Sequence, residues 1–378
     1  MNIGFDAKRV VQNNTGLGNY GRYMIEILSR FYPDNHYLLF APKRKKNERL
    51  TPLHAQANVS FIFPSGIDRI IPSIWRTIGI HKDLINSEVA IFHGLSNELP
   101  VKIRHSKIKL VVSIHDLIFL RYPEFYHPID RWIYRWKFQR ACQIADRIIA
   151  VSECTKRDIV SFFSVPEERI TVVYQGCHPQ FRQLVTEEKK RKMREKYQLP
   201  PCFLLYVGSI EPRKNLLLAV KALIRLPEDI HLVAIGKATS YQTKVEAYAR
   251  ESGLESRLHI RNDFLFSDLP TAYQSATVFL YPSFFEGFGI PVIEALSCGV
   301  PVIAATGSCL EEAGGPDSIY VHPEDDRELA TRILEIVNDE QLATRMKEAG
   351  KIYVKRFDDE RIASKIIGIY QTLYPENP

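Results

Sequence analysis

The chain has 378 residues, of which 45% are hydrophobic and 25% charged, and its formal net charge is +6. This balance excludes a generally disordered chain, which needs low hydrophobicity and high net charge. No apolar run reaches the roughly 18 residues of a membrane span, and the first residues lack the basic and apolar segments of a secretory signal. The length predicts two or three domains.

The six cysteines lie far apart and form no C-x-x-C pair. Scattered thiols in a long chain are typical of a reduced, cytoplasmic protein without a disulfide framework or a zinc ribbon. No spacing of His, Cys and Asp residues resembles a metal site, so no bound metal is expected.

The charge is divided unevenly along the chain. Residues 1–200 hold 32 Lys and Arg against 19 Asp and Glu, whereas the remaining residues hold 18 against 25. A basic half indicates an anionic partner, such as nucleic acid, lipid headgroups or a phosphorylated acceptor. A solvated charged face accounts for the same residues without any partner.

Short apolar runs alternate with amphipathic stretches along nearly the whole chain. Strands rich in Val, Ile and Leu, separated by helices, predict an α/β protein whose doubly wound parallel sheets are covered on both faces. The first half carries predicted strands at 2–7, 37–41, 59–63, 89–93, 110–115, 147–152 and 170–174, with helices at 19–31 and 130–145. The second half carries predicted strands at 203–207, 231–235, 258–261, 278–281, 302–305 and 318–321.

A charged segment at 186–196, followed by Pro200 and Pro201, separates the two halves and is typical of a linker or domain edge. We therefore predict an N-terminal Rossmann-like domain over residues 1–185 and a C-terminal one over residues 186–357. The two would face each other across a cleft at the carboxyl ends of their strands, where such sheets bind ligands. Residues 358–378 have a helical pattern that does not predict where the helix packs. It can pack anywhere, including on the first domain.

A glycine loop, T-G-L-G-N-Y-G at residues 15–21, lies between the first predicted strand and the first long helix. Glycine permits close backbone approach, and free N–H groups at a helix start attract phosphate. Gly16, Gly18 and Gly21 match G-x-G-x-x-G by letter but lie later than in a dinucleotide-binding fingerprint. A tight strand-to-helix turn explains them equally well.

Two glutamates follow the strand 278–281 in the sequence E-G-F-G-I-P-V-I-E. Pro291 suits the first turn of a helix, which places Glu286 in the preceding loop and Glu294 about one turn into the helix. This separation suits two hydroxyl-bearing parts of one ligand better than a close acid–base pair. The alternative is a loop carboxylate beside one that the helix dipole favours.

Two cations, Arg213 and Lys214, follow the strand 203–207 in the sequence E-P-R-K-N. Cations at a helix start oppose its dipole, so they indicate a bound anion such as a diphosphate. Partial neutralisation by Glu211 is the alternative.

His115 ends the strand 110–115 and is expected to face the predicted cleft. A histidine at such a place can contact a ligand, but a structural histidine paired with Asp116 fits this segment as well.

Taken together, these motifs resemble the retaining nucleotide-sugar glycosyltransferases of the GT-B fold, the family of bacterial mannosyltransferases, sucrose synthases and glycogen synthases. The resemblance covers nearly the whole chain, and its most specific mark is the E-x7-E motif at residues 286–294. One departure is Ser209, where many relatives carry an arginine that Arg213 would replace. The segment V-S-E-C-T-K-R-D-I at residues 151–159 looks closest to bacterial transferases that build surface polysaccharides.

The resemblance implies catalytic roles for His115, Glu286 and Lys214. Glu286 would contact donor-sugar hydroxyls, Glu294 the nucleotide ribose, and Arg213 with Lys214 the diphosphate. The amides of Phe288 and Gly289 would hold the sugar. The full donor-binding set that it implies is Gly16, Gly18, Arg213, Lys214, Asn262, Phe288, Gly289, Ile290 and Glu294.

The reaction implied is transfer of a sugar, mannose or a similar hexose, from a nucleoside diphosphate sugar to an acceptor hydroxyl with retained configuration. No metal and no cofactor is expected, and the partners are the nucleotide-sugar donor and a glycan or lipid-linked acceptor. If the acceptor is lipid-linked, the basic N-terminal half would contact the inner membrane face. Residues 43–46 and 102–109 would then supply charge, and Trp132, Tyr134 and Trp136 would act as interfacial anchors.

Two other functions remain open on the sequence. A sugar-nucleotide epimerase of similar two-domain build would carry comparable motifs. A basic nucleic-acid-binding protein would need aromatic side chains gathered on one basic face. The aromatic residues of the helix 130–145 (Trp132, Tyr134, Trp136 and Phe138) alternate and cannot all share one face, so no nucleic-acid partner is expected.

Overall fold

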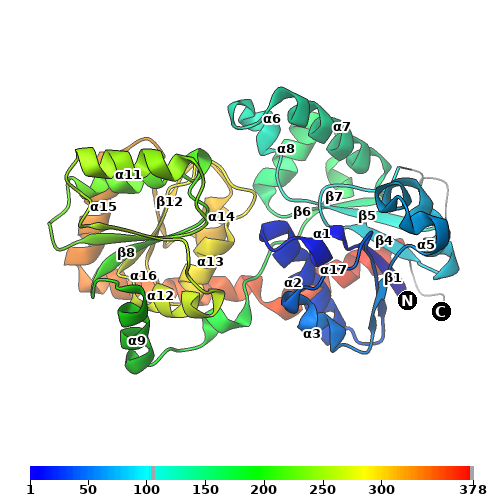
Figure 1. Ribbon diagram of the computed structural model, residues 1–378, viewed down its shortest axis with the longest axis horizontal. Coiled ribbons are helices and arrows are strands. Elements are labelled where there is room, and N and C mark those ends of the chain that lie inside the picture. The colour runs from blue at the N-terminus through cyan, green and yellow to red at the C-terminus, as the bar shows by residue number, and fades with distance from the viewer. Residues whose placement is uncertain (102, 104–106, 375–378) are drawn as a thin grey trace. The chain divides into compact units, whose positions relative to one another are not determined.

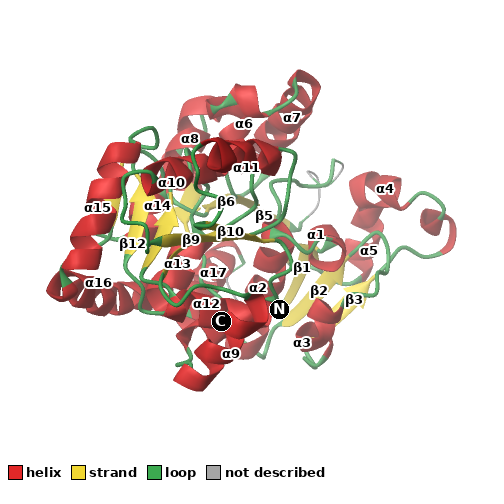
Figure 2. Cartoon of the chain, turned by 60° about the vertical axis from the view of Figure 1, so that its left-hand side comes forward, coloured by secondary structure: helices red, strands yellow, loops and turns green. Residues whose placement is uncertain are grey.

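A computed structural model describes residues 1–101, 103 and 107–374 of the chain. The chain divides into two compact units (Figures 1 and 2). Unit 1 comprises Met1–Gln175 together with the residues from Asp358 onward, and unit 2 comprises Gly176–Phe357.

Unit 1 is built on a seven-stranded parallel sheet in the order β3-β2-β1-β4-β5-β6-β7. Its strands are β1 Asn2–Asp6, β2 His36–Phe40, β3 Val59–Ile62, β4 Ile91–Gly94, β5 Lys109–Ile114, β6 Arg147–Ala150 and β7 Ile170–Val172. Its helices are α1 Lys8–Gln12, α2 Gly16–Phe31, α3 Thr51–His54, α4 Pro72–Ile74, α5 Ile80–Asn86, α6 Ile118–Arg121, α7 Pro128–Ile144, α8 Glu153–Phe163 and α17 Asp359–Leu373.

Unit 2 is built on a six-stranded parallel sheet in the order β10-β9-β8-β11-β12-β13. Its strands are β8 Phe203–Val207, β9 His231–Ile235, β10 Leu258–Arg261, β11 Val278–Tyr281, β12 Val302–Ala305 and β13 Ile319–Val321. Its helices are α9 Glu187–Tyr197, α10 Leu216–Leu223, α11 Tyr241–Glu251, α12 Leu269–Ser275, α13 Ile290–Ser297, α14 Leu310–Gly314, α15 Asp326–Asn338 and α16 Glu340–Tyr353.

Both sheets confirm the predicted doubly wound α/β class. Each predicted strand is present, with ends that differ by at most two residues. In each sheet the strand order reverses beside its first strand, between β1 and β4 in unit 1 and between β8 and β11 in unit 2. Ligands of open parallel sheets bind outside the carboxyl ends of the strands at such a reversal.

The boundary between the units lies earlier than the predicted one after residue 185. Residues 176–185 belong to unit 2 because their side chains and backbone pack there. Phe181 is fully buried and meets the ring of Tyr273 edge-on at 5.7 Å, and the backbone N–H of Val185 donates to Gln274 Oε1 at 2.9 Å.

The segment 186–196, predicted to be a linker or domain edge, forms helix α9 near the start of unit 2. Thr186 caps the helix, since its hydroxyl accepts the Lys189 N–H. At the other end Tyr197 is buried, stacks on Phe264 at 3.9 Å and donates to Asp268 Oδ2 at 2.8 Å. The dense charges of this segment therefore cover the exposed face of a packed helix.

Helix α17 lies in unit 1, against α2 (Figure 1). Asp359 in its first turn is buried and accepts hydrogen bonds from Tyr23 Oη at 2.9 Å and Arg30 Nη2 at 2.7 Å. Farther along, Tyr370 is fully buried, and its hydroxyl lies 2.6 Å from Nδ1 of His93 on β4. The apolar side chains of α17 in the unit 1 core are Ile362, Ala363, Ile366, Ile367 and Ile369.

The charge difference between the units is smaller than the one between the halves of the sequence. Unit 1 holds 27 Lys and Arg against 20 Asp and Glu, and unit 2 holds 23 against 24. The basic helix α9 belongs to unit 2, and the acidic start of α17 belongs to unit 1. Unit 1 is still the basic one.

Replacing Tyr370 by Phe is expected to destabilise the protein by about 1–3 kcal/mol, because it leaves the buried His93 Nδ1 without its partner. Tyr374→Phe, at the exposed end of the same helix, is the matched control. Urea denaturation followed by fluorescence measures both. Equal stability of the two variants would contradict the assigned role of the hydroxyl.

Candidate functional site

In unit 2, Arg213 and Lys214 lie in the loop after β8, which is hydrogen-bonded to the loop after β11. β8 ends at Val207, and a short turn, Pro212–Lys214, precedes α10. Asn215 adopts a left-handed conformation (φ 57°), and its side-chain amide donates to the carbonyls of Pro282 and Pro323 at 3.0 and 2.7 Å. The Arg213 carbonyl accepts the Phe284 N–H at 2.9 Å, so the loops after β8 and β11 are joined.

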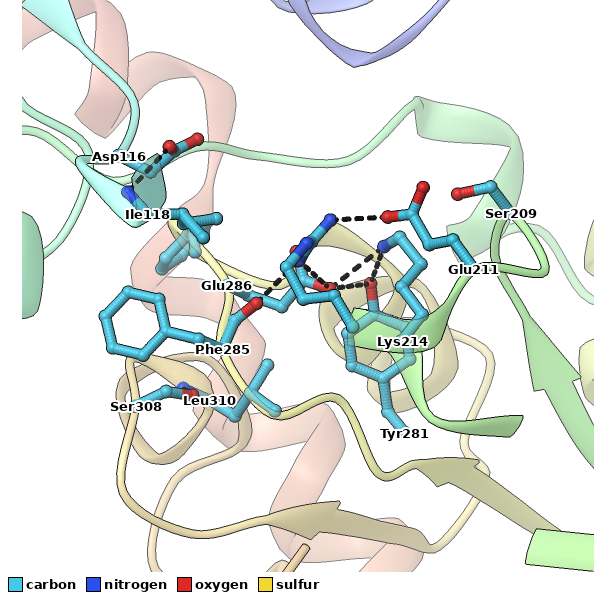
Figure 3. A network of polar contacts seen from close by, with 12 residues as sticks. Asp116, Ile118, Ser209, Glu211, Lys214, Tyr281, Phe285, Glu286, Ser308 and Leu310 are labelled. Atoms are coloured by element: carbon cyan, nitrogen blue, oxygen red, sulfur yellow. Dashed lines mark hydrogen bonds and ion pairs between the residues drawn. The ribbon is translucent and has the colours of Figure 1, made fainter. Parts of the chain in front are cut away.

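These loops meet at the reversal of strand order, where Glu286 lies between the two cations. Glu286 Oε1 lies 2.9 Å from Lys214 Nζ and 3.0 Å from Arg213 Nη1. The Tyr281 hydroxyl accepts from Lys214 at 2.7 Å and donates to Glu286 at 3.2 Å. Figure 3 shows Lys214, Tyr281 and Glu286 converging.

The charges of this cluster are mutually stabilised. Burial alone would raise the pKa of Glu286, but the neighbouring Lys214 and Arg213 charges outweigh it and hold the pKa at about 2. Burial likewise opposes the charge of Arg213, whose pKa is nevertheless raised by Glu286 and Glu211. The Glu286 carboxylate and the Arg213 guanidinium are therefore ionised at neutral pH.

The alternative in which Glu211 neutralises the cations is correct for Arg213. Glu211 Oε1 lies 2.8 Å from Arg213 Nη2 (Figure 3). The pairing of Glu286 with both cations was not predicted, because the two motifs are 72 residues apart in the sequence. It also missed Tyr281, which ends a buried strand and looks there like an ordinary core residue.

Glu294 differs from Glu286 in its surroundings. It lies in α13, where Pro291 occupies the first turn as predicted. Glu294 Oε2 accepts from the buried Tyr273 hydroxyl at 3.0 Å. Burial raises the pKa of Glu294 to about 8, only partly offset by this bond, so the side chain is mostly protonated at neutral pH.

The turn before α13 requires its glycine. Gly289 has φ 112°, and a Cβ there would lie 2.7 Å from Leu310 Cδ2. Phe288 turns its side chain into the interior, where it meets Phe357 edge-on at 5.5 Å, and Ile290 is half-buried. Phe288 thus has its backbone rather than its ring to offer a ligand.

Asn262 follows β10 and is exposed. Its side-chain nitrogen donates to the Gly236 carbonyl at 2.7 Å and to Gln242 Oε1 at 3.1 Å. The side chain is therefore held at the carboxyl end of the sheet.

The predicted site residues of unit 1 are Gly16, Gly18 and His115. A Cβ at Gly18 would lie 1.9 Å from the Asn13 carbonyl oxygen, so the close packing of α2 requires this glycine without any ligand. The tight-turn alternative therefore accounts for Gly18. A Cβ at Gly16, the first residue of α2, would meet nothing within 4 Å.

His115 is buried and fixed from several sides. Its backbone N–H donates to Asn97 Oδ1 at 2.8 Å, and its Nε2 lies 2.9 Å from the Leu95 carbonyl oxygen. The ring meets Tyr20 edge-on at 4.5 Å. The alternative of a ring paired with Asp116 is wrong, since the ring bonds to Leu95.

These contacts assign the protonation state of His115. Burial lowers its pKa to about 4, so the ring is neutral at pH 7. A carbonyl oxygen only accepts hydrogen bonds, so Nε2 carries the proton and Nδ1 presents a lone pair.

Behind His115 runs a buried chain of hydrogen bonds. Tyr20 Oη lies 2.8 Å from Ser113 Oγ, which lies 2.9 Å from Nε2 of His93. The other ring nitrogen of His93 reaches Tyr370 on α17. The bonds between these residues were not predicted, because the residues lie far apart in the sequence; polar side chains inside predicted buried strands were the available signal.

Comparison with known proteins identifies the family. Residues 20–181 match the family model described as Glycosyltransferase Family 4, and residues 187–353 match that of Glycosyl transferases group 1. The O-antigen chain mannosyltransferase B of Escherichia coli is 30% identical over 293 residues, which cover 75% of this chain and 74% of that protein. The chain belongs to the GT-B glycosyltransferases.

Two further proteins are similar to this glycosyltransferase. The serotype-specific mannosyltransferase WbdA of Escherichia coli is 28% identical over 68% of the chain, which spans only 33% of WbdA. The solved structure of Anabaena HepE in complex with UDP and glucose has a TM-score of 0.76 at 19% identity, covering 98% of this chain and 100% of that one. At such identity the likeness concerns the fold alone, and it confirms the predicted GT-B fold.

Two features are absent from the described residues of the glycosyltransferase. No helix among them has the length and apolar character to cross a bilayer. No three of their His, Cys, Asp or Glu side chains are grouped as the ligands of a metal ion.

Replacing Glu294 by Gln should stabilise the ligand-free protein increasingly as the pH rises. The raised pKa means that the wild type loses stability between the ordinary pKa of 4.5 and about 8, because folding then keeps a proton that the unfolded chain releases. The melting-temperature difference between Glu294→Gln and wild type should therefore grow from pH 5 to pH 8. Glu340→Gln, on an exposed start of α16, is the control; a flat difference for Glu294→Gln would refute the raised pKa.

Proposed function

We propose that this glycosyltransferase moves a hexose, mannose before others, from a nucleoside diphosphate sugar to an acceptor hydroxyl during synthesis of a bacterial surface polysaccharide. The observation that carries the proposal is the pair of basic side chains, Arg213 and Lys214, at the strand-order reversal of unit 2. The relatives named as O-antigen and serotype-specific mannosyltransferases support the choice of sugar and product.

The nucleotide-sugar donor would be held by cationic, anionic and neutral groups of unit 2. Arg213 and Lys214 bind the diphosphate through charge-assisted hydrogen bonds. Glu286 accepts from sugar hydroxyls, and the protonated Glu294 exchanges hydrogen bonds with the ribose. The amides of Phe288, Gly289 and Ile290 hold the sugar, and Asn262 lies beside the nucleobase.

Considered by itself, unit 1 offers a substrate three candidate groups, at Gly16, Gly18 and His115. The lone pair on His115 Nδ1 can accept a hydrogen bond from a substrate hydroxyl, because Nε2 is engaged by the Leu95 carbonyl. The open space beside Gly16 leaves the start of α2 accessible to a phosphate or a sugar.

Transfer would retain the anomeric configuration through displacement on one face of the sugar. The bond from the anomeric carbon to the diphosphate oxygen breaks as the acceptor oxygen bonds to the same face, and the leaving diphosphate takes the acceptor proton. Lys214 and Arg213 stabilise the charge that develops on the diphosphate. Since side-chain cations do this work, we propose that neither a metal ion nor a cofactor is required.

The decisive experiment pairs a binding screen with a transfer assay. Thermal shifts against nucleotide sugars identify the donor, since a ligand at 100 times its dissociation constant adds about 2.7 kcal/mol of stability. Transfer to saccharide acceptors is then followed in EDTA, with the anomer assigned by NMR. Inverted product, or activity lost in EDTA and restored by magnesium, would overturn the mechanism. A changed sugar still attached to its nucleotide, without acceptor, would favour the epimerase alternative.

Replacing Lys214 by Ala should weaken binding of the nucleoside diphosphate about 10- to 100-fold. The lost bond is charge-assisted, and such bonds contribute roughly 1.5–3 kcal/mol. Isothermal titration calorimetry measures the effect, with Lys221→Ala on the neighbouring helix α10 as control. An unchanged dissociation constant for Lys214→Ala would exclude the diphosphate role.

We further propose that unit 1 contacts the anionic inner face of the cytoplasmic membrane, where a lipid-linked acceptor would be found. On α7, Trp132 is 72% exposed and Trp136 50%, whereas Phe138 is buried. The Val101 N–H bonds to Thr77, and the Arg140 guanidinium reaches the Val101 carbonyl, so α7 adjoins a second apolar segment. That segment exposes Ile67, Ile70, Ile71, Ile74 and Ile78.

Unit 1 also exposes cations. Residues 43–46 are exposed. Lys102 and residues 104–106 of the other predicted basic segment lie outside the described residues, whereas Lys107 is exposed. Each cation near an anionic leaflet contributes about 1 kcal/mol to binding.

Binding to vesicles should rise with the fraction of anionic lipid and fall as salt is raised. The double variant Trp132→Ala/Trp136→Ala should sediment less with anionic vesicles than the wild type, because interfacial tryptophans are lost. Ile352→Ala, an exposed apolar residue of unit 2, is the control. Equal, negligible binding of wild type to neutral and anionic vesicles at low salt would refute the membrane contact.

A further inference from the structure

The cation pair of unit 2 already holds an anion of its own. Glu286 accepts from Arg213 and Lys214 through a single oxygen, Oε1, and the three side chains are only 12–16% exposed. Glu211 pairs with Arg213 as well, so two carboxylates balance two cations. A diphosphate that binds there meets a neutral cluster rather than free positive charge.

We propose that Glu286 is a built-in competitor for the diphosphate, which favours the intact donor over the spent nucleotide and speeds release of the latter. This inference rests on the proposed function, in which Glu286 contacts sugar hydroxyls. It adds a second role to that contact: Glu286 senses whether a sugar is still attached to the diphosphate.

The Glu286 carboxylate stays charged at neutral pH and is bonded to both basic side chains. Glu286 stays ionised and shielded from water, so it needs donor groups at all times. When a nucleotide sugar binds, the sugar hydroxyls supply donors, and the cations are free to turn toward the diphosphate. Donor binding thus gives Glu286 the sugar hydroxyls as partners and gives the two cations the diphosphate. No buried charge is left unpaired.

The situation changes once the sugar has been transferred. A bound nucleoside diphosphate offers Glu286 no hydroxyl in the sugar position, so the carboxylate draws on Lys214 and Arg213 again. The diphosphate then shares its cations with an anion fixed in the protein, which lowers its affinity. Tyr281 keeps the carboxylate within reach, because its hydroxyl bonds to both Glu286 and Lys214.

A neutral amide of the same shape removes the competition. Glu286→Gln should bind a nucleoside diphosphate roughly 10-fold more tightly than wild type, since two charge-assisted bonds no longer hold the cations. Its affinity for the nucleotide sugar should change less, because the amide still meets the sugar hydroxyls. Turnover should fall strongly.

The test uses calorimetric titration of the full chain with UDP, GDP and inorganic pyrophosphate, and with the nucleotide sugar that the thermal screen selects. Glu211→Gln is the matched control: it pairs only with Arg213 and is 33% exposed, so its effect should stay below about threefold. Thermal melts establish that each variant is folded. If Glu286→Gln is unfolded, Glu286→Asp, one methylene shorter, is used and should give a smaller tightening.

The outcomes separate this inference from the proposed function. Tighter binding of the nucleoside diphosphate by Glu286→Gln, beyond any gain for the nucleotide sugar, supports the competitor role. If wild type binds the nucleotide but the variant binds it no more tightly, the competitor role is wrong and the donor site stands. If wild type binds none of the probes, the donor site itself is wrong, and the inference falls with it.

Discussion

The ion pairs of Glu286 are the interactions on which the arrangement of the loops after β8 and β11 in unit 2 depends. The Glu286 carboxylate gathers Lys214 and Arg213 from the loop after β8 and Tyr281 from the end of β11. A shielded charge without a partner costs several kcal/mol, so these groups stabilise one another only as a set. Asn215 and the Arg213 carbonyl tie the same two loops through the backbone, which keeps the charged groups within reach.

Environment gives the two glutamates of one short motif opposite protonation states. Glu286 lies among cations and has a pKa of about 2, whereas Glu294, buried beside the Tyr273 hydroxyl, has a pKa of about 8. The two carboxyl groups therefore do not share a proton as a catalytic dyad would. The Glu286 carboxylate can compete for cations, and the neutral Glu294 carboxyl group can form hydrogen bonds with hydroxyl groups. Both can therefore contact one nucleotide-sugar donor.

The sequence allowed the sheets to be predicted because buried parallel strands are continuous apolar runs, and Pro291 marked the start of α13 because proline fits a first turn. Residues 176–185 were assigned to the wrong unit, since only tertiary contacts such as that between Phe181 and Tyr273 reveal where a loop packs. The charges at 186–196 suggested a linker, yet two buried side chains suffice to dock α9. Which residue pairs with Glu286 or His115 depends on spatial neighbours that no local pattern encodes.

In unit 1 the corresponding constraint is a line of neutral polar groups rather than an ion cluster. The line runs from Tyr370 on α17 through His93 and Ser113 to Tyr20 on α2, whose ring abuts His115. Every member is buried, so a shift of α17 would break bonds that water cannot replace. The last helix of the chain therefore helps to fix both the start of α2 and the His115 ring, which explains why unit 1 includes a segment that follows unit 2 in the sequence.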